Sequence, residues 1–145
     1  MKGTLLNSIA LLPFLLLLGC TSSKSGTASK PKLKDHNTFV VTELSADKTY
    51  GYTEGNPVKV GGVEKSEGPL NERRFLNALA GPNGERITYS RLGSCCHFKT
   101  KNGIMGGGLL DKYQVQWEGL AEPVLIYINM YDYGPLKVPA GFTAK

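Results

Sequence analysis

Apolar and polar residues alternate with a period of two in the second half of the chain. Within residues 109–118, Tyr113, Val115 and Trp117 share one parity, while lysine, glutamine and glutamate share the other. This alternation predicts a β-strand with one buried and one solvated face. Residues 124–128 are apolar at both parities, which predicts a central strand covered on both sides. Because only six residues link the two stretches, we expect the strands to pair antiparallel.

Shorter patterns precede these two strands. β-branched and aromatic residues predict strands over Thr38–Leu44, Thr49–Thr53, Val58–Val60 and Arg86–Leu92. Between them, Pro69–Ala80 places apolar residues at helical spacing, with proline in the first turn and glycine after the last residue. The chain is therefore expected to adopt an α+β fold: a mainly antiparallel sheet of five or six strands with one packed helix.

The longest apolar run, Leu5–Leu18, lies at the N-terminus. Lys2 precedes it, and the tetrapeptide Leu17–Cys20 (LLGC) ends it before a polar stretch. This combination is typical of a bacterial lipoprotein signal, which is cut before a cysteine that becomes lipidated. The run is shorter than the roughly 20 residues that a transmembrane helix needs. We expect residues 1–19 to be a signal peptide, and acyl chains on Cys20 to bind the protein to a membrane.

Charge and composition divide the rest of the chain. Residues 20–36 are rich in serine, threonine, glycine and lysine, which predicts a lipidated flexible tether. Residues 37–145 are expected to form a single α+β domain. The formal net charge of the chain is +5, but residues 36–145 hold 12 basic and 11 acidic side chains. The domain is therefore nearly neutral, and no nucleic-acid partner is expected.

Ser94–His97 (SCCH) is the main cluster of reactive side chains, and three interpretations remain open. The favoured one is structural: Cys95 and Cys96 are small buried thiols beside a turn, or form a disulfide between neighbours. The second is a metal site of both cysteines, His97 and the more distant His36, but adjacent strand residues point to opposite faces. The third is a thiol nucleophile with His97 as its base. No metal or other cofactor is expected.

Three further features have simpler interpretations. The charged segment Asn71–Arg74 is expected to be a solvated helix face. Asp111 shares the parity of Tyr113, so it should point to the covered side of its strand and need a partner such as an arginine. The glycine-rich stretch Gly103–Gly108 does not match a phosphate-binding loop, and we interpret it as a mobile connection.

Four segments of sequence are similar to those of a known group of proteins. They are NERRFLNAL (residues 71–79), GSCC (93–96), GLLDKY (108–113) and YINMYD (127–132). In these segments the chain resembles small lipoproteins of Bacteroidetes-type Gram-negative bacteria, over roughly residues 48–142. Some members carry the label 2-dehydro-3-deoxyphosphooctonate aldolase by automatic transfer. That enzyme resembles a (β/α)₈ barrel of at least about 200 residues, so no catalytic residue is carried over to this chain.

These observations predict a lipid-anchored envelope lipoprotein. Its domain would be a non-enzymatic binding or interaction module, with an unknown envelope protein or component as its partner. No acidic residue closely follows Cys20, which by analogy with related bacteria favours an outer-membrane anchor facing the periplasm. The alternative is a small envelope enzyme or a thiol or metal module that uses Cys95, Cys96 and His97.

Overall fold

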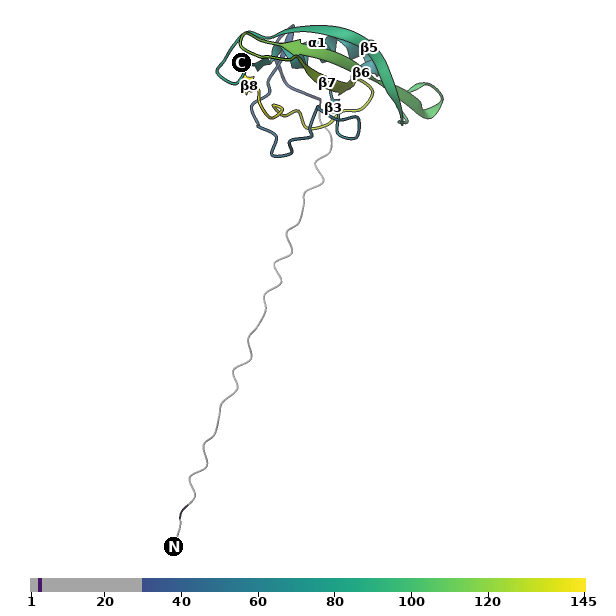
Figure 1. The fold of residues 1–145 in the computed structure, drawn as a ribbon. Coiled ribbons are helices and arrows are strands. Elements are labelled where there is room, and N and C mark those ends of the chain that lie inside the picture. Colours follow the sequence, from purple (N-terminus) through teal and green to yellow (C-terminus); the bar gives the residue numbers. More distant parts are fainter. Residues whose placement is uncertain (1–2, 4–29) are drawn as a thin grey trace.

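The computed structural model describes residue 3 and residues 30–145. Cys20 and nearly all of the expected signal peptide lie outside the described residues. No helix in the described part is long and apolar enough to cross a membrane. Residues 30–145 form an α+β domain in which a twisted four-stranded sheet packs over one α-helix (Figure 1).

The elements follow in a simple order. They are β1 (Leu33–Asp35), β2 (Thr38–Phe39), β3 (Val58–Lys59), a 3₁₀ turn η1 (Val63–Lys65), α1 (Gly68–Asn77), β4 (Leu79–Ala80), β5 (Thr88–Lys99), a 3₁₀ turn η2 (Ile104–Gly106), β6 (Gly107–Gln116), β7 (Val124–Asn129) and β8 (Thr143–Ala144). The main sheet has the strand order β3-β7-β6-β5. β6 is antiparallel to both of its neighbours, whereas β3 runs parallel to β7. The pairs β1–β2 and β4–β8 form separate two-stranded sheets.

The α+β class with one α-helix is confirmed for the described residues, but the predicted sheet is wrong. The main sheet has four strands, and it is mixed because β3 is parallel to β7. The expected strand at Thr49–Thr53 forms turns instead, since the Asp47 carboxylate accepts hydrogen bonds from the Thr49 backbone N–H (2.8 Å) and hydroxyl (2.7 Å). Such local side-chain bonds compete with strand pairing. The expected strand at Thr38–Leu44 is reduced to β2 and a single bridge at Leu44.

The structured part also reaches further toward the N-terminus than expected. Leu33–Asp35, which lies in the predicted tether, forms β1 and pairs with β2. Arg74 of α1 also donates a hydrogen bond from Nε to the backbone oxygen of His36 (2.8 Å). The domain therefore includes residues that composition alone assigned to a flexible segment.

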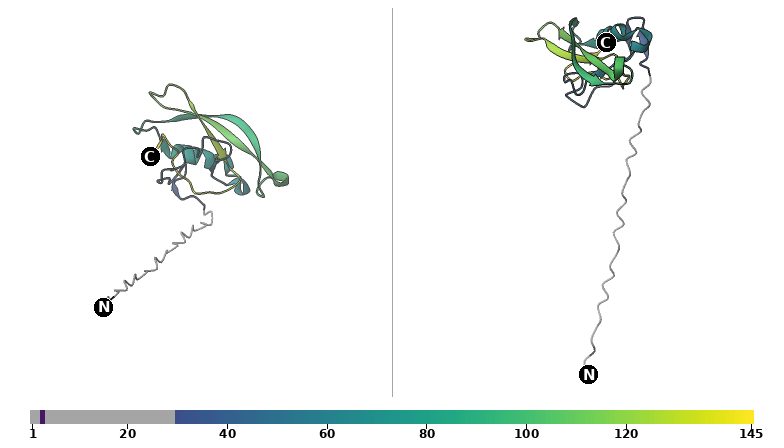
Figure 2. Two further views of the ribbon diagram at one scale, coloured as in Figure 1. Left: turned by 60° about the horizontal axis from the view of Figure 1, so that its bottom comes forward. Right: turned by 90° about the vertical axis from the view of Figure 1, so that its right-hand side faces the viewer.

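α1 packs its apolar side against one face of the main sheet (Figure 2). Phe75 and Leu76 are fully buried there, together with Ile126 and Ile128 of β7. The helix ends at Asn77 rather than at Ala80, because the next residues turn away to pair with β8. Pro69 lies in the first turn as predicted, where its missing N–H costs no hydrogen bond.

β5 and β6 form a long twisted hairpin that extends beyond the rest of the domain (Figure 1). β5 continues to Lys99, well past the predicted end at Leu92. Two β-bulges interrupt its register, between Arg91 and Gly93 and between Cys95 and His97. The antiparallel pairing of β6 with β7 is confirmed. The prediction that both faces of β7 are covered is wrong, because Leu125 is 38% exposed on the face opposite α1.

Candidate functional site

A network of polar side chains lies between α1 and the main sheet. It consists of Glu72, Arg91, Ser94, Asp111 and Tyr113, and we call it the Asp111 cluster. In the register of the hairpin, Ser94 lies opposite Asp111, and Arg91 lies opposite Tyr113. Arg91 and Ser94 are three positions apart, so in a regular strand they would point to opposite faces. The bulge between them adds one residue, which brings both side chains to the face that α1 covers.

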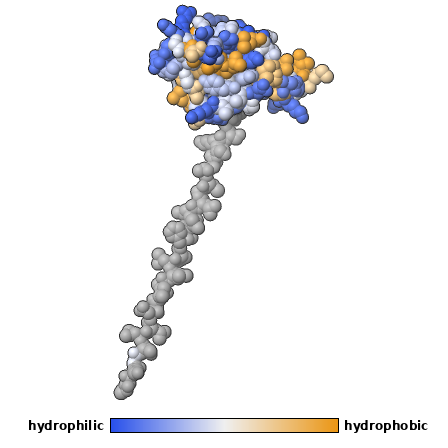
Figure 3. Space-filling model, viewed as in Figure 1, coloured by the Kyte–Doolittle hydropathy of each residue, from blue (hydrophilic) through white to orange (hydrophobic). Residues whose placement is uncertain are grey.

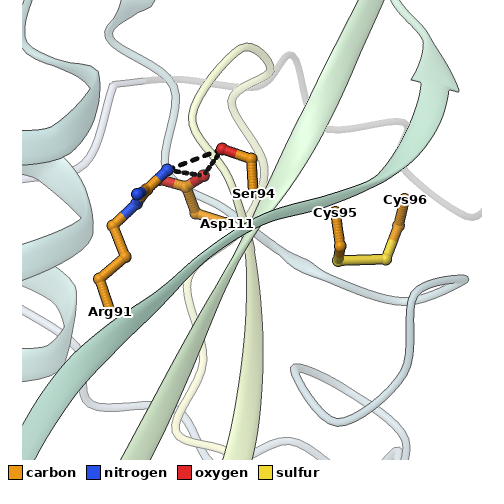
Figure 4. The surroundings of a disulfide bond; sticks show 5 residues. All are labelled: Arg91, Ser94, Cys95, Cys96 and Asp111. Atoms are coloured by element: carbon orange, nitrogen blue, oxygen red, sulfur yellow. Dashed lines mark hydrogen bonds and ion pairs between the residues drawn. A yellow bond between two sulfur atoms is a disulfide. The ribbon is translucent and has the colours of Figure 1, made fainter.

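Asp111 is 2% exposed and is held by two residues of β5. Arg91 donates to it from Nε (2.6 Å) and Nη2 (2.8 Å), and the Ser94 hydroxyl donates to Oδ1 (2.7 Å) (Figure 4). Arg91 Nη2 also contacts the Ser94 Oγ at 2.7 Å. Although burial alone would raise it, the bonds from Arg91 and Ser94 hold the pKa of Asp111 below its usual range. The prediction that Asp111 needs an arginine partner is confirmed.

Glu72 approaches the same carboxylate from α1 and is fully buried. Its Oε2 accepts a hydrogen bond from the Tyr113 hydroxyl (2.9 Å). Its Oε1 has no donor among the described residues, but the Glu72 carboxyl is within hydrogen-bonding contact of Asp111. Burial, and then the charge of Asp111, raise the pKa of Glu72 to about 8. The Glu72 carboxyl therefore favours its neutral form at pH 7, beside the ionised Asp111.

The Asp111 cluster thus joins α1 to the sheet through the hydrogen bond from Tyr113 to Glu72. It has the components of acid–base chemistry, a neutral carboxyl beside an ionised one. However, each carboxyl is directed at the other and at protein donors, and both are almost inaccessible. Burial also raises the pKa of Tyr113, with the Glu72 carboxyl as a further cause. What the geometry supports is a stabilising link between helix and sheet.

The two neighbouring cysteines form a disulfide on β5. Their Cα atoms are 3.8 Å apart, and both residues are half-buried. Cys96 is the extra residue of the second bulge and has a left-handed backbone, with φ 56°. The disulfide projects from the opposite side of β5 to Ser94 (Figure 4). Because a bonded cysteine lacks a thiolate, this state fits the structural interpretation and not the nucleophile or metal interpretations.

The histidines that the sequence suggested as weak metal ligands do not come together as a site. His97 is exposed, and its ring packs against Gly107, where a Cβ would clash with it. His36 is also exposed. No group of three or more histidine, cysteine or acidic side chains in the described part is arranged to hold a metal ion.

The expectation that Asn71–Arg74 is a solvated helix face is wrong, because only Arg73 is exposed. Asn71 donates from Nδ2 to the Gly61 carbonyl (3.0 Å). Arg74 is 5% exposed and donates from Nη1 to the Asn71 Oδ1 (2.8 Å). These groups satisfy one another, and with Glu72 they make the polar side of α1 part of the interior.

A second polar cluster fastens the loop at the end of the β5–β6 hairpin to the segment after β7. Asp132 accepts hydrogen bonds from the Thr100 hydroxyl (2.6 Å) and from the side-chain amides of Asn102 and Asn129 (both 2.9 Å). Burial opposes ionisation here, yet these donors hold the pKa of Asp132 below its usual range. The sequence offered no motif for this cluster, because its members are spread over more than thirty positions.

Beyond that fastening, the hairpin ends in two bare apolar side chains. Ile104 is 87% exposed and Met105 is fully exposed, and we call this pair the hairpin tip. Apolar surface gathers at this end of the molecule beside hydrophilic residues (Figure 3). Behind the tip lies a shallow cavity of about 240 Å³, lined by His97, Ile104, Gly107, Gly108, Leu109 and Tyr131. The expected mobile connection thus has a defined turn, closed by a backbone bond from Thr100 to Gly106 (3.0 Å).

No protein-family model matches the chain, and neither a curated protein nor a solved structure shows significant similarity to it. The function is therefore inferred from the fold and from these clusters. Together they describe a small α+β domain whose carboxyls Glu72 and Asp111 are buried and whose two most exposed large apolar side chains lie at one hairpin end.

Proposed function

We propose that the protein is a lipid-anchored envelope protein whose domain is a non-enzymatic binding or interaction module. In this proposal acylated Cys20 attaches the chain to the outer membrane, and the domain faces the periplasm. The motif Leu17–Cys20, which follows an apolar run and precedes a polar stretch, supports the anchor. The α+β fold with one described α-helix also differs from the (β/α)₈ barrel that the transferred aldolase label would require.

One observation carries the proposal for the domain: its titratable groups are used to hold the fold together. A catalytic acid or base must reach the proton that it moves on a substrate. Asp111 and Glu72 are 2% and 0% exposed, and they share their hydrogen bonds with Arg91 and Tyr113. The raised pKa of Glu72 has a structural explanation in burial beside Asp111. The two most exposed large apolar side chains, Ile104 and Met105, are available for contact with a partner, which suits binding.

The anchor is tested by producing the whole chain in a Gram-negative host and separating membranes from soluble periplasm. The wild type should be recovered with the outer-membrane fraction, and the Cys20→Ala variant should appear elsewhere. A control that replaces Ser22 by alanine should behave as the wild type. Recovery of the wild type in the soluble fraction, or no effect of Cys20→Ala, would contradict the proposal.

The disulfide supports a second candidate, a thiol–disulfide exchange module. Cys95–Cys96 is half-buried on an open face of β5, so a thiolate of a partner could attack it. This candidate predicts that Cys96→Ser, which leaves Cys95 as a lone thiol, traps partners as mixed disulfides in intact cells. The binding proposal predicts no such adducts. Non-reducing gels of cells treated with acid to stop thiol exchange distinguish the two.

A further inference from the structure

We propose that the hairpin tip inserts into the surface of the membrane to which the chain is anchored, with an anionic phospholipid layer as its binding partner. This inference rests on the proposed lipid anchor. It gives the domain a defined orientation: the β5–β6 hairpin acts as a second membrane contact beside the acyl chains.

The chemistry of the tip favours insertion into a membrane. Ile104 and Met105 expose almost their whole side chains to solvent, at the outermost turn of the longest hairpin. Met105 also has a left-handed backbone, with φ 53° and ψ 31°, in a loop with several glycines that could take this conformation without strain. A methionine with a left-handed backbone and an exposed side chain lowers the stability of the folded state. Contact with water alone gives no reason for a methionine at this position.

The charge beside the tip favours an anionic lipid surface. Lys99 ends β5 and Lys101 follows in the loop, and both are exposed beside the tip. The nearby Asp132 carboxylate is occupied by the loop itself through Thr100 and Asn102. The far turn of the hairpin partner strand, residues 118–122, instead exposes two glutamates. The hairpin thus has an apolar, basic end and an acidic end, and the basic end matches the negative potential of an anionic lipid surface.

The position at which the tether joins the domain also supports the proposal. Lys30 is the first residue of the described segment 30–145, and its Nζ lies 5.9 Å from the centre of the Tyr133 ring. The preceding residue, Asp132, is the one that fastens the base of the hairpin loop. Cys20 lies ten residues before Lys30, which limits their separation to about 36 Å. The first described residue thus lies beside the segment that fastens the hairpin loop, and within about 36 Å of a membrane that holds Cys20.

Size favours lipid over a protein partner. A stable protein interface buries about 800 Å² on each side. Two adjacent side chains on one turn offer far less than that, but they suit insertion to the depth of the head groups, with lysine stems lying along the apolar layer. A second copy of the chain or another protein remains an outcome that the experiment below can detect.

The experiment uses the acylated mature protein, purified with its anchor and reconstituted in vesicles of phosphatidylcholine and phosphatidylglycerol. Some vesicles contain brominated lipids, which quench tryptophan fluorescence only at short range. The native Trp117 follows β6 at the other end of the hairpin and serves as an internal reference. In Met105→Trp we expect at least a twofold loss of the added emission in brominated vesicles. In the matched control Leu44→Trp, an exposed apolar site (65%) outside the hairpin, we expect no loss.

Charge is tested in the same vesicles. Lys99→Glu with Lys101→Glu, added to Met105→Trp, should reduce quenching, and so should vesicles of phosphatidylcholine alone. For the unacylated mature chain with Cys20→Ser, the same charge reversal should lower partitioning to anionic vesicles by about fivefold or more per lysine. Circular dichroism confirms that each variant is folded.

The possible outcomes separate the two proposals. Protein that does not sediment with the vesicles overturns the lipid anchor. Protein that sediments with them, but in which Met105→Trp is quenched no more than Leu44→Trp, overturns the insertion of the tip. A cross-link from position 105 to another copy or another protein, without quenching, also overturns it and assigns the tip to that partner.

Discussion

The Asp111 cluster and the hairpin tip both include residues of the β5–β6 hairpin, but the environments of their side chains are opposite. In the cluster, the carboxyls of Asp111 and Glu72 are buried and accept hydrogen bonds from neighbouring side chains. At the tip, apolar groups are exposed and contact little else. Buried paired polar groups stabilise and position a structure, whereas exposed apolar groups are costly unless they meet a partner. The comparison indicates that the cluster serves the fold and the tip serves binding.

The largest expected effect is a pH dependence that comes from Glu72. The folded state raises its pKa to about 8, while the unfolded chain has the ordinary value of 4.5. Between these values the folded protein keeps a proton that the unfolded chain releases. The contribution of Glu72 to the free energy of unfolding is therefore fully present below about pH 4.5. It falls by about 1.4 kcal/mol per pH unit as the pH rises toward 8. Asp111 has the opposite pH dependence, because its pKa is lowered in the folded state. Its contribution to the free energy of unfolding is lost only as the pH falls below 3.8, the ordinary pKa of an aspartate.

Glu72→Gln should remove this dependence, because an amide can donate to Asp111 and accept from Tyr113 at any pH. Urea unfolding between pH 5 and pH 8 should give a nearly constant free energy for the variant. At pH 8 the variant should be more stable than the wild type. If the wild type becomes more stable between pH 5 and pH 8, the raised pKa of Glu72 is contradicted.

Loss of Arg91 should be the next largest effect. Arg91→Met leaves the buried Asp111 carboxylate without its main partner, which typically costs 3–5 kcal/mol for a fully buried pair. The Arg91 side chain is 46% exposed, so water replaces part of the interaction, and we expect about 2 kcal/mol. Arg91→Lys should cost less, since the charge remains without the paired bonds. Unfolding midpoints at pH 7 measure both, and a neutral Arg91→Met would contradict the role given to the ion pair.

The disulfide should contribute less to stability than the ion pair. A bond between neighbouring residues closes almost no loop, so it constrains the unfolded chain very little. Cys95→Ser with Cys96→Ser should change the free energy of unfolding by about 1 kcal/mol or less. Cys96→Gly with Cys95→Ser is the sharper variant, because glycine adopts the left-handed backbone of position 96 without strain. A loss above about 3 kcal/mol would show that the disulfide holds the bulge in place.

The smallest expected effect on stability is at the hairpin tip. Ile104→Asp with Met105→Asp should change the unfolding free energy by no more than about 0.5 kcal/mol, because both side chains are already in water. The same double variant should abolish the membrane contact proposed for the tip. A large destabilisation, measured by the thermal midpoint, would mean that the tip is part of the fold and would remove the contrast with the Asp111 cluster.

The parts of the fold that sequence predicted well are those in which residue type and position agree. β6 alternates between polar and apolar residues from Lys112 to Gln116, and its partner β7 follows after a short link, so both strands and their antiparallel pairing were predictable. The need of Asp111 for an arginine also followed from its parity. The parallel pairing of β3 with β7 was not predictable, because it depends on contacts between segments 70 residues apart.

Two features of the Asp111 cluster escaped prediction for specific physical reasons. Glu72 has the spacing of a core residue, since it precedes Phe75, Leu76 and Leu79 by three, four and seven positions. A glutamate side chain is usually charged and exposed, whereas burial beside Asp111 raises the pKa of Glu72 and so favours a neutral carboxyl. The bulge that brings Arg91 and Ser94 to one face left no periodic signal, because a single extra residue reverses the parity of everything after it.

The central claim, that acyl chains on Cys20 hold this domain at a membrane, is tested most directly by mass spectrometry of the N-terminal peptide. The material should come from membranes of cells that express the whole chain. The account predicts a peptide that begins at Cys20, with a diacylglyceryl group on sulfur and a further acyl chain on nitrogen. A peptide that retains residues 1–19, or an N-terminus with an unmodified Cys20, would contradict it.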